Sequence, residues 1–394
     1  MTQLSEPLRL HDLTFLPDGD DVVVGRVDID SYGVFPPDGA ALLQQLVAGV
    51  PPHAAADWYA RTYGEPVDLD EFLGVLTELE FTAQDEVIAD PKPPRWQRLG
   101  RWLFSPVGWV CHGLLLAAAA VAMASTPELI PRVANLFYTD YTTAIALTFF
   151  LGQFPLILVH ESFHALAGRR LGLHSRLRIS RRLYFVVFET SLDGLVVFPR
   201  RRRYLPILAG MLADLLVIAV LTLVAAATLG PDGKVGLLGA ICLALAFATF
   251  LRFLWQFYFH LQTDLYVVAV TVLGCQDLQA AARRILRDRF RRLAGRPGLD
   301  LTGLHPRDRE VGRWYSWLLL FGYVLTTATL LLFGVPALWR LLTMLWHGLT
   351  AGDGGQVLDS VVFLTLMLGQ FALAGYLAMR ARRLRPAAPT HLTS

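Results

Sequence analysis

Residues 141–168 read YTTAIALTFFLGQFPLILVHESFHALAG, and this stretch decides the class of the protein. It is almost wholly apolar and long enough to cross a bilayer as a helix, until His160, Glu161 and His164 interrupt it. On a helix, His160 and His164 lie one turn apart on the same face, so they present two imidazoles to one metal ion. Two histidines and a carboxylate are costly in hydrocarbon, and we therefore expect a functional site here.

The residue types suit a zinc site of the hydrolytic kind, which uses three protein ligands and leaves one position for water. Glu161 has the reach to take a proton from that water. Asp264 is the best candidate for the third ligand, and His260, one turn earlier, is a rival ligand or a partner that hydrogen-bonds to a ligand. Asp214 also lies in an apolar run, where bonding to a neighbouring helix is its expected role. The alternative is a pair of core histidines bonded to backbone carbonyls.

The composition is that of a polytopic membrane protein, with a mean hydropathy of +0.45, 54% hydrophobic residues and 17% charged residues. Residues 1–90 contain 18 Asp and Glu against 3 Arg, a net charge of −15, so the remainder carries +17. This asymmetry predicts a soluble acidic domain fused to a membrane domain. The acidic domain would repel phosphates, which argues against nucleic acid as a partner. No secretory signal precedes the domain, so we expect it in the cytosol.

Apolar runs of membrane-spanning length recur after the Pro-rich segment 90–94. They cover residues 106–124, 141–167, 205–229, 235–258, 315–338 and 357–379. Arginine clusters flank these runs, and all clusters fall on one side only with six crossings and both termini in the cytosol. Residues 235–274 would form a straight helix about 60 Å long, twice the thickness of the hydrocarbon core. We therefore expect a break near residues 252–263.

The first domain combines strands with short helices. Residues 22–35 alternate as two short strands. Three helices are predicted, over residues 38–47, 52–63 and 68–81. Two or three strands with three short helices are typical of a winged-helix unit.

This unit resembles the PqqD-like domains that recognise leader peptides of ribosomally made, modified peptides. The resemblance covers about residues 8–85 and rests on the strand pair, on Gly39-Ala40 opening a helix, and on VDLDEFL at 67–73. It implies that an extended peptide adds as a strand, in a groove between the 22–29 strand and the 68–81 helix. The alternative is a cytosolic domain without a ligand.

The metal-site residues resemble those of the site-2 protease family of intramembrane zinc metalloproteases. The resemblance covers about residues 95–295 and rests on HESFHALAG at 160–168, RRRRY at 200–204 and DLY at 264–266. The closest subgroup looks like the peptide zinc metalloproteases that carry a PqqD-like domain in front. The resemblance implies that His160, His164 and Asp264 bind Zn²⁺ and that Glu161 is the general base and acid.

Two features depart from that family's pattern. Leu265 replaces the glycine after the aspartate, which changes backbone freedom beside the ligand. Gln256 stands where the family has an asparagine that holds a substrate strand, and Phe259 replaces a proline. Gln256 is therefore the candidate substrate-binding residue, through its amide. Residues 183–199, predicted as a hairpin around Asp193-Gly194, are a second element that could present a substrate.

The sequence thus predicts a helical polytopic protein of the cell membrane, with about six transmembrane helices and a small winged-helix α+β domain. Its parts are a peptide-recognition domain at 1–88, a Pro/Arg linker at 89–104, a zinc metalloprotease core at 105–295, and a helix pair with a cytosolic tail at 296–394.

The expected function is zinc-dependent cleavage of a peptide or small protein within the lipid membrane. The alternative is a non-catalytic peptide-binding protein for export or immunity, with a structural or vestigial metal site. A transporter is disfavoured, since no internal repeat with paired broken helices is visible. The sequence does not indicate an oligomeric state.

Overall fold

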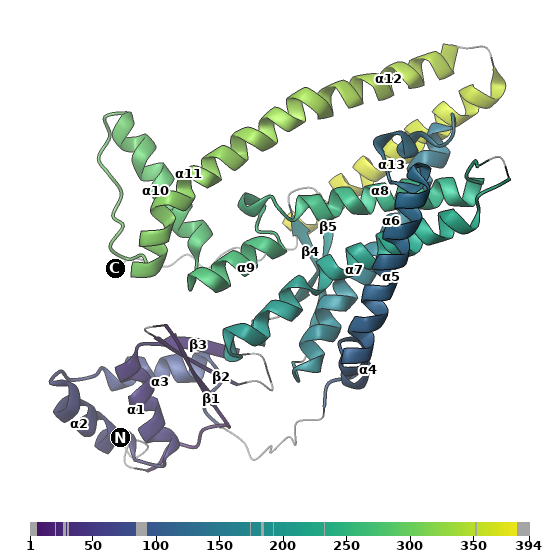
Figure 1. Cartoon of the computed structure of the whole chain (residues 1–394). Helices are drawn as coiled ribbons and strands as arrows, with labels where there is room; N and C mark the ends of the chain where they lie inside the picture. Colours follow the sequence, from purple (N-terminus) through teal and green to yellow (C-terminus); the bar gives the residue numbers. More distant parts are fainter. Residues whose placement is uncertain are drawn as a thin grey trace.

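The computed structural model describes residues 6–19, 21–26, 29, 31–83, 93–173, 175–182, 185–191, 193–231, 233–350 and 353–383. These residues are mostly helical, with one small sheet near the amino terminus and a two-stranded sheet in mid-chain (Figure 1). The predicted class, a helical membrane protein with a small amino-terminal domain that contains strands, agrees with this architecture.

The amino-terminal domain opens with an antiparallel sheet in the order β1 (Thr14–Asp18), β2 (Asp21–Arg26), β3 (Ser31–Phe35). The three predicted helices follow as α1 (Pro37–Val47), α2 (Pro52–Tyr63) and α3 (Leu69–Glu78). Tyr59 on α2 donates a hydrogen bond to Asp38 on α1, which lowers the pKa of that carboxyl below its usual value. Sheet and helices share one apolar core, which includes Val24, Phe35, Leu42, Leu43, Leu46 and Leu76.

Strand β1 corrects the expected peptide groove. The strand predicted over 22–29 is β2, which ends at Arg26 and pairs with β1 on one side and with β3 on the other. It therefore has no free edge at which a peptide strand could add. Pro17 obscured β1 in the sequence, because proline is rare in strands and is tolerated mainly at sheet edges.

Five described helices are long and apolar enough to cross a membrane. They are α5 (Pro106–Ser125), α6 (Thr142–Arg170), α7 (Arg200–Ala227), α8 (Leu237–Trp255) and α11 (Pro306–Thr329), the last extended by the π-helical turn η5 (Leu330–Gly334). The pair α9 (Asp264–Leu273) and α10 (Leu278–Leu293), bent by 86°, makes a sixth if counted as one span. The short helix α4 (Gln97–Leu103) precedes α5 within the predicted linker, whose first residues, 89–92, lie outside the described part of the chain.

The predicted break in the long apolar run is confirmed. Helix α8 ends at Trp255, a 3-10 turn η4 (Phe259–Leu261) follows, and α9 begins at Asp264. Gln262 takes the left-handed conformation there, with φ of +56°. Left-handed backbone cannot continue a right-handed helix, so the chain changes direction just before Asp264.

The segment between the last two predicted runs is helical, and the predicted hairpin is displaced. Residues 339–350 follow the predicted run 315–338 and continue its helix as α12 (Val335–Thr350), because Leu and Met favour helix there. Helix α13 (Gly354–Arg383) then contains the last predicted run, 357–379.

The hairpin is β4 (Arg176–Arg182) with β5 (Phe185–Ser191), so the predicted turn at Asp193 lies instead in the 3-10 helix η3 (Asp193–Val197). The sequence did not predict β4, because its arginines interrupt the apolar pattern that is typical of a strand. The turns η1 (Pro127–Leu129) and η2 (Val133–Phe137) join α5 to α6.

The amino-terminal sheet is docked on the helical part of the chain. Asp18 at the end of β1 pairs with Arg200 Nε at 2.6 Å and with Arg203 Nη2 at 2.9 Å, both on the first turn of α7. Gly25 in β2 lies against Val197 of η3, so closely that a Cβ at position 25 would be 2.5 Å from Val197 Cγ1. The sheet therefore has its own core on one face and η3 on the other.

Candidate metal centre

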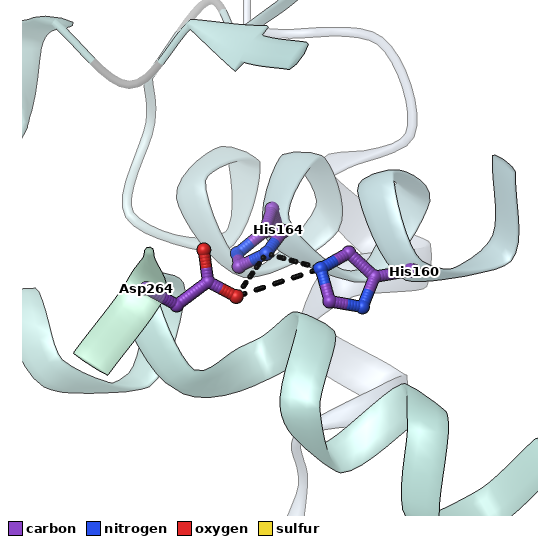
Figure 2. A group of neighbouring side chains, drawn as sticks. All are labelled: His160, His164 and Asp264. Atoms are coloured by element: carbon purple, nitrogen blue, oxygen red, sulfur yellow. Dashed lines mark hydrogen bonds and ion pairs between the residues drawn. The ribbon is translucent and has the colours of Figure 1, made fainter. Parts of the chain in front are cut away.

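The structure brings three of the predicted site residues together (Figure 2). His160 and His164 are buried on one face of α6, with their Nε2 atoms 3.2 Å apart. Asp264, the first residue of α9, places Oδ2 3.5 Å from His160 Nε2 and 3.3 Å from His164 Nε2. The break between α8 and α9 makes this possible, because the first residue of α9 comes to lie beside the histidines of α6.

These three atoms fit a tetrahedral metal ion. Ligands about 2.0–2.1 Å from a tetrahedral zinc stand about 3.3 Å from one another, which matches the three distances. Asp264 Oδ2 is buried and has no hydrogen-bond partner. Oxygen and nitrogen lone pairs that converge in a buried site repel one another unless a cation lies between them. The donor set and its spacing could therefore hold a divalent ion.

The hydrogen bond made by His164 Nδ1 establishes which ring nitrogen can bind a metal ion. His164 Nδ1 lies 2.7 Å from the carbonyl oxygen of Pro206 on α7. A carbonyl oxygen only accepts hydrogen bonds, so Nδ1 carries the hydrogen and donates it. In the neutral ring, Nε2 then keeps its lone pair, directed at the common point shared with His160 and Asp264.

Gly210 on α7 lies against the two imidazoles. A Cβ at this position would be 2.5 Å from His160 Nε2 and closer still to His164 Nε2. Any side chain at position 210 would therefore occupy the space where the donor atoms converge. Sequence reasoning missed this role, although Gly210 stands in the middle of an apolar run, where glycine often marks a close approach.

Asp214 lies one turn further along α7 and, as expected, bonds to a neighbouring helix. Its Oδ1 accepts hydrogen bonds from Arg252 of α8, at 2.6 Å from Nη2 and 3.1 Å from Nε. Asp214 Oδ1 also lies 3.1 Å from His160 Nδ1, a contact that the sequence did not predict. A detectable signal was present, because Asp214 and Arg252 are opposite charges in consecutive apolar runs.

The other two candidates lie in the turn that leads to Asp264. Gln256 is buried, and its Oε1 accepts the backbone N–H of Asp264 at 3.0 Å, while Thr263 Oγ1 donates to the Gln256 carbonyl. His260 Nε2 lies 2.7 Å from Thr326 Oγ1 on α11, outside the group of three donors. In the structure both side chains hold the turn in place.

Glu161 contacts the two-stranded sheet. Its Oε2 accepts the backbone N–H of Thr190 on β5 at 2.9 Å, and Thr190 Oγ1 donates to the Glu161 carbonyl at 3.0 Å. The N–H of Thr190 is directed at α6 and not at β4, so this edge of β5 faces the helix that carries the histidines.

No family model, curated protein or solved structure matches the chain. The arrangement itself offers three inward-facing donor atoms on two helices, with a carboxylate next to one of them in sequence. Such a group can bind a metal ion and transfer a proton beside it.

Proposed function

We propose that the protein is an intramembrane zinc endopeptidase in which His160, His164 and Asp264 hold Zn²⁺. The observation that carries this proposal is the convergence of three buried donor atoms at tetrahedral spacing on apolar helices. Zinc bound there supplies a Lewis acid for a water molecule and for the scissile carbonyl.

Glu161 moves the proton in the proposed reaction. Its carboxylate takes a proton from the attacking water as the water oxygen bonds to the scissile carbonyl carbon. The C–N bond then breaks, and Glu161 returns the same proton to the leaving amine. The N–H of Thr190, which is bonded to Glu161 Oε2, holds the carboxylate on the side of α6 that faces β5.

An extended substrate suits both sheets. A helical substrate keeps its carbonyls in hydrogen bonds, so the scissile segment must be unwound. The edge of β5 beside Glu161 can hold such a segment. In the amino-terminal domain, which we propose is a PqqD-like winged-helix unit, β3 lies beside the end of α3, where Ser31 Oγ donates to the Leu79 carbonyl. We place peptide capture at β3 because β2 is paired on both sides.

The proposed location is the cell membrane, with both termini in the cytosol. This orientation rests on the arginine clusters that flank the apolar helices. It places the acidic amino-terminal domain in the compartment where ribosomally made peptides arise.

Substitution of the proposed base separates catalysis from metal binding. Glu161→Gln removes the proton acceptor but no metal ligand, so we expect cleavage of a quenched-fluorescent peptide library to fall at least about 100-fold. Zinc in the purified protein stays near one per chain, whereas His164→Ala and Asp264→Ala lose it. Glu310→Gln, at an exposed carboxylate on α11, is the matched control. Unchanged cleavage by Glu161→Gln would refute the mechanism.

A non-catalytic peptide-binding protein for export or immunity is the second candidate. It is favoured by the hydrogen bond that already engages Glu161 Oε2 and by Leu265 beside the third ligand. It requires Glu161→Ala to leave the cellular phenotype intact while substitutions along β3 abolish it. Absence of zinc from the native protein, purified without chelator, would also favour this candidate.

A further inference from the structure

Asp214 and Arg252 form a buried ion pair beside the proposed metal centre. The Asp214 side chain is fully buried in α7, a membrane-length apolar helix. Two guanidinium nitrogens of Arg252 bond to one of its oxygens. A carboxylate in such surroundings is costly, and a fixed counter-charge offsets only part of that cost. A purely structural role could be filled by apolar residues of similar volume, so the pair calls for another explanation.

The same guanidinium extends the contact to α6, the helix that carries both histidines. Arg252 Nη1 donates to Gln153 Oε1 at 3.1 Å, and Nη2 reaches the carbonyl oxygen of Leu156 at 3.4 Å. Leu156 lies one turn before His160, so its carbonyl belongs to the turn on which that imidazole is carried. Arg252 therefore connects α6, α7 and α8 at the level of the metal centre.

His160 faces Asp214 through a ring nitrogen that has no other partner. His160 Nδ1 is buried without a hydrogen bond and lies 3.1 Å from Asp214 Oδ1, while Asp214 Oδ2 is likewise buried and unbonded. A carboxylate oxygen accepts hydrogen bonds, so Asp214 favours the tautomer of His160 that carries its hydrogen on Nδ1. The hydrogen on Nδ1 leaves the Nε2 lone pair for the metal, as the Pro206 carbonyl does for His164.

We propose that Asp214, held by Arg252, is a positioning residue that selects the tautomer and orientation of His160 and thereby raises the affinity of the centre for zinc. This inference rests on the proposed zinc site. Carboxylates that orient a metal-bound histidine typically raise metal affinity about 10–100-fold. The two hydrogen bonds from Arg252 fix the direction of the Asp214 carboxylate, so the two residues act as one unit.

Three variants separate positioning from folding. Asp214→Asn and Arg252→Met each break the buried pair, whereas the double variant Asp214→Leu, Arg252→Met replaces it with apolar side chains. We expect both single variants to unfold at lower temperature, and the double variant to recover much of that loss. Zinc affinity, measured by competition with a chromogenic chelator on the full-length protein in detergent, should stay about 10–100-fold below native in the double variant.

Cobalt(II) gives a readout that a merely structural role would not change. The visible absorption of cobalt-loaded protein reports the ligand field, so loss of the Asp214 contact should shift it in the double variant. Asp359→Asn is the control, because this carboxylate binds the opposite end of α6 and should leave affinity and spectrum unchanged. A double variant with native zinc affinity and native spectrum would overturn the positioning role, although the zinc site would stand. A native protein that binds neither metal would overturn the zinc site itself.

Discussion

Single residues in α7 set the space and the direction of the candidate centre. Gly210 leaves room where the two imidazoles converge, and the Pro206 carbonyl orients His164. Neither residue supplies one of the three candidate donor atoms, yet each determines where a donor atom lies. Helix α7 is therefore as much a part of the centre as α6, which carries the histidines.

Gly210→Ala should abolish or strongly weaken metal binding. The added methyl would lie 2.5 Å from His160 Nε2, so the ring must move, and overpacking of this kind costs about 1–3 kcal/mol of stability. Zinc content and the midpoint of thermal unfolding measure the two effects. Gly113→Ala on α5 is the control, because a Cβ there meets nothing within 4 Å. Normal zinc content in Gly210→Ala would show that the donor atoms do not converge as described.

Helix α6 is held at both ends by other elements. At its start, Asp359 of α13 accepts the backbone N–H groups of Thr142 and Thr143 at 2.9 and 3.0 Å. At its other end, Ser175 Oγ donates to the Ala165 carbonyl, one residue beyond His164. The first N–H groups of a helix have no partner within it, so a carboxylate from another helix satisfies them and favours the helix dipole.

Asp359→Ala should lower the stability of the protein by about 1 kcal/mol, the usual value of a helix N-cap. Zinc content should not change, because the cap lies at the far end of α6 from the histidines. Thermal unfolding compared with Asp140→Ala provides the measurement. Asp140 precedes the same helix and makes no hydrogen bond to it among the described residues. Equal midpoints in the two variants would contradict a capping role for Asp359.

At the scale of the whole molecule, the amino-terminal domain is docked on η3 and on the start of α7. Arg200 and Arg203 come from the arginine cluster at the start of α7, and both bind Asp18. Arg203 also donates to the carbonyls of Val196 and Phe198, which flank the end of η3. The acidic domain thus lies on the segment that connects β5 to α7.

Cysteines at the docking surface should report the contact. In a variant without the native cysteines, Gly25→Cys and Val197→Cys should form a disulfide, since a Cβ at position 25 lies 2.5 Å from a γ-carbon of Val197. Adding Asp18→Lys places a cation beside Arg200 and should slow cross-linking several-fold. The shift of the oxidised protein on a non-reducing gel gives the yield. Equal rates with and without Asp18→Lys would mean that the ion pairs do not hold the domain.

Several features followed from local rules in the sequence. The one-turn spacing of His160 and His164 results from the helical period, and the break before Asp264 from an apolar run longer than a bilayer. Asp264 was predicted as the third donor, and the structure brings it to the two histidines. Strand β1 and the β4–β5 pairing were missed, because a proline and a series of arginines masked patterns that only strand partners stabilise.

The sequence by itself determined the membrane-length helices, the acidic first domain and the donor residues, because hydropathy, charge and helical spacing depend on neighbours along the chain. Only the tertiary structure decided that Gly210 adjoins the imidazoles, that Asp214 faces His160, and that Asp18 binds Arg200. These contacts join residues distant in sequence, and they depend on how the helices pack and rotate against one another. One sequence carries no periodic signal for helix packing. The candidate centre depends on that packing, because its residues come from different helices.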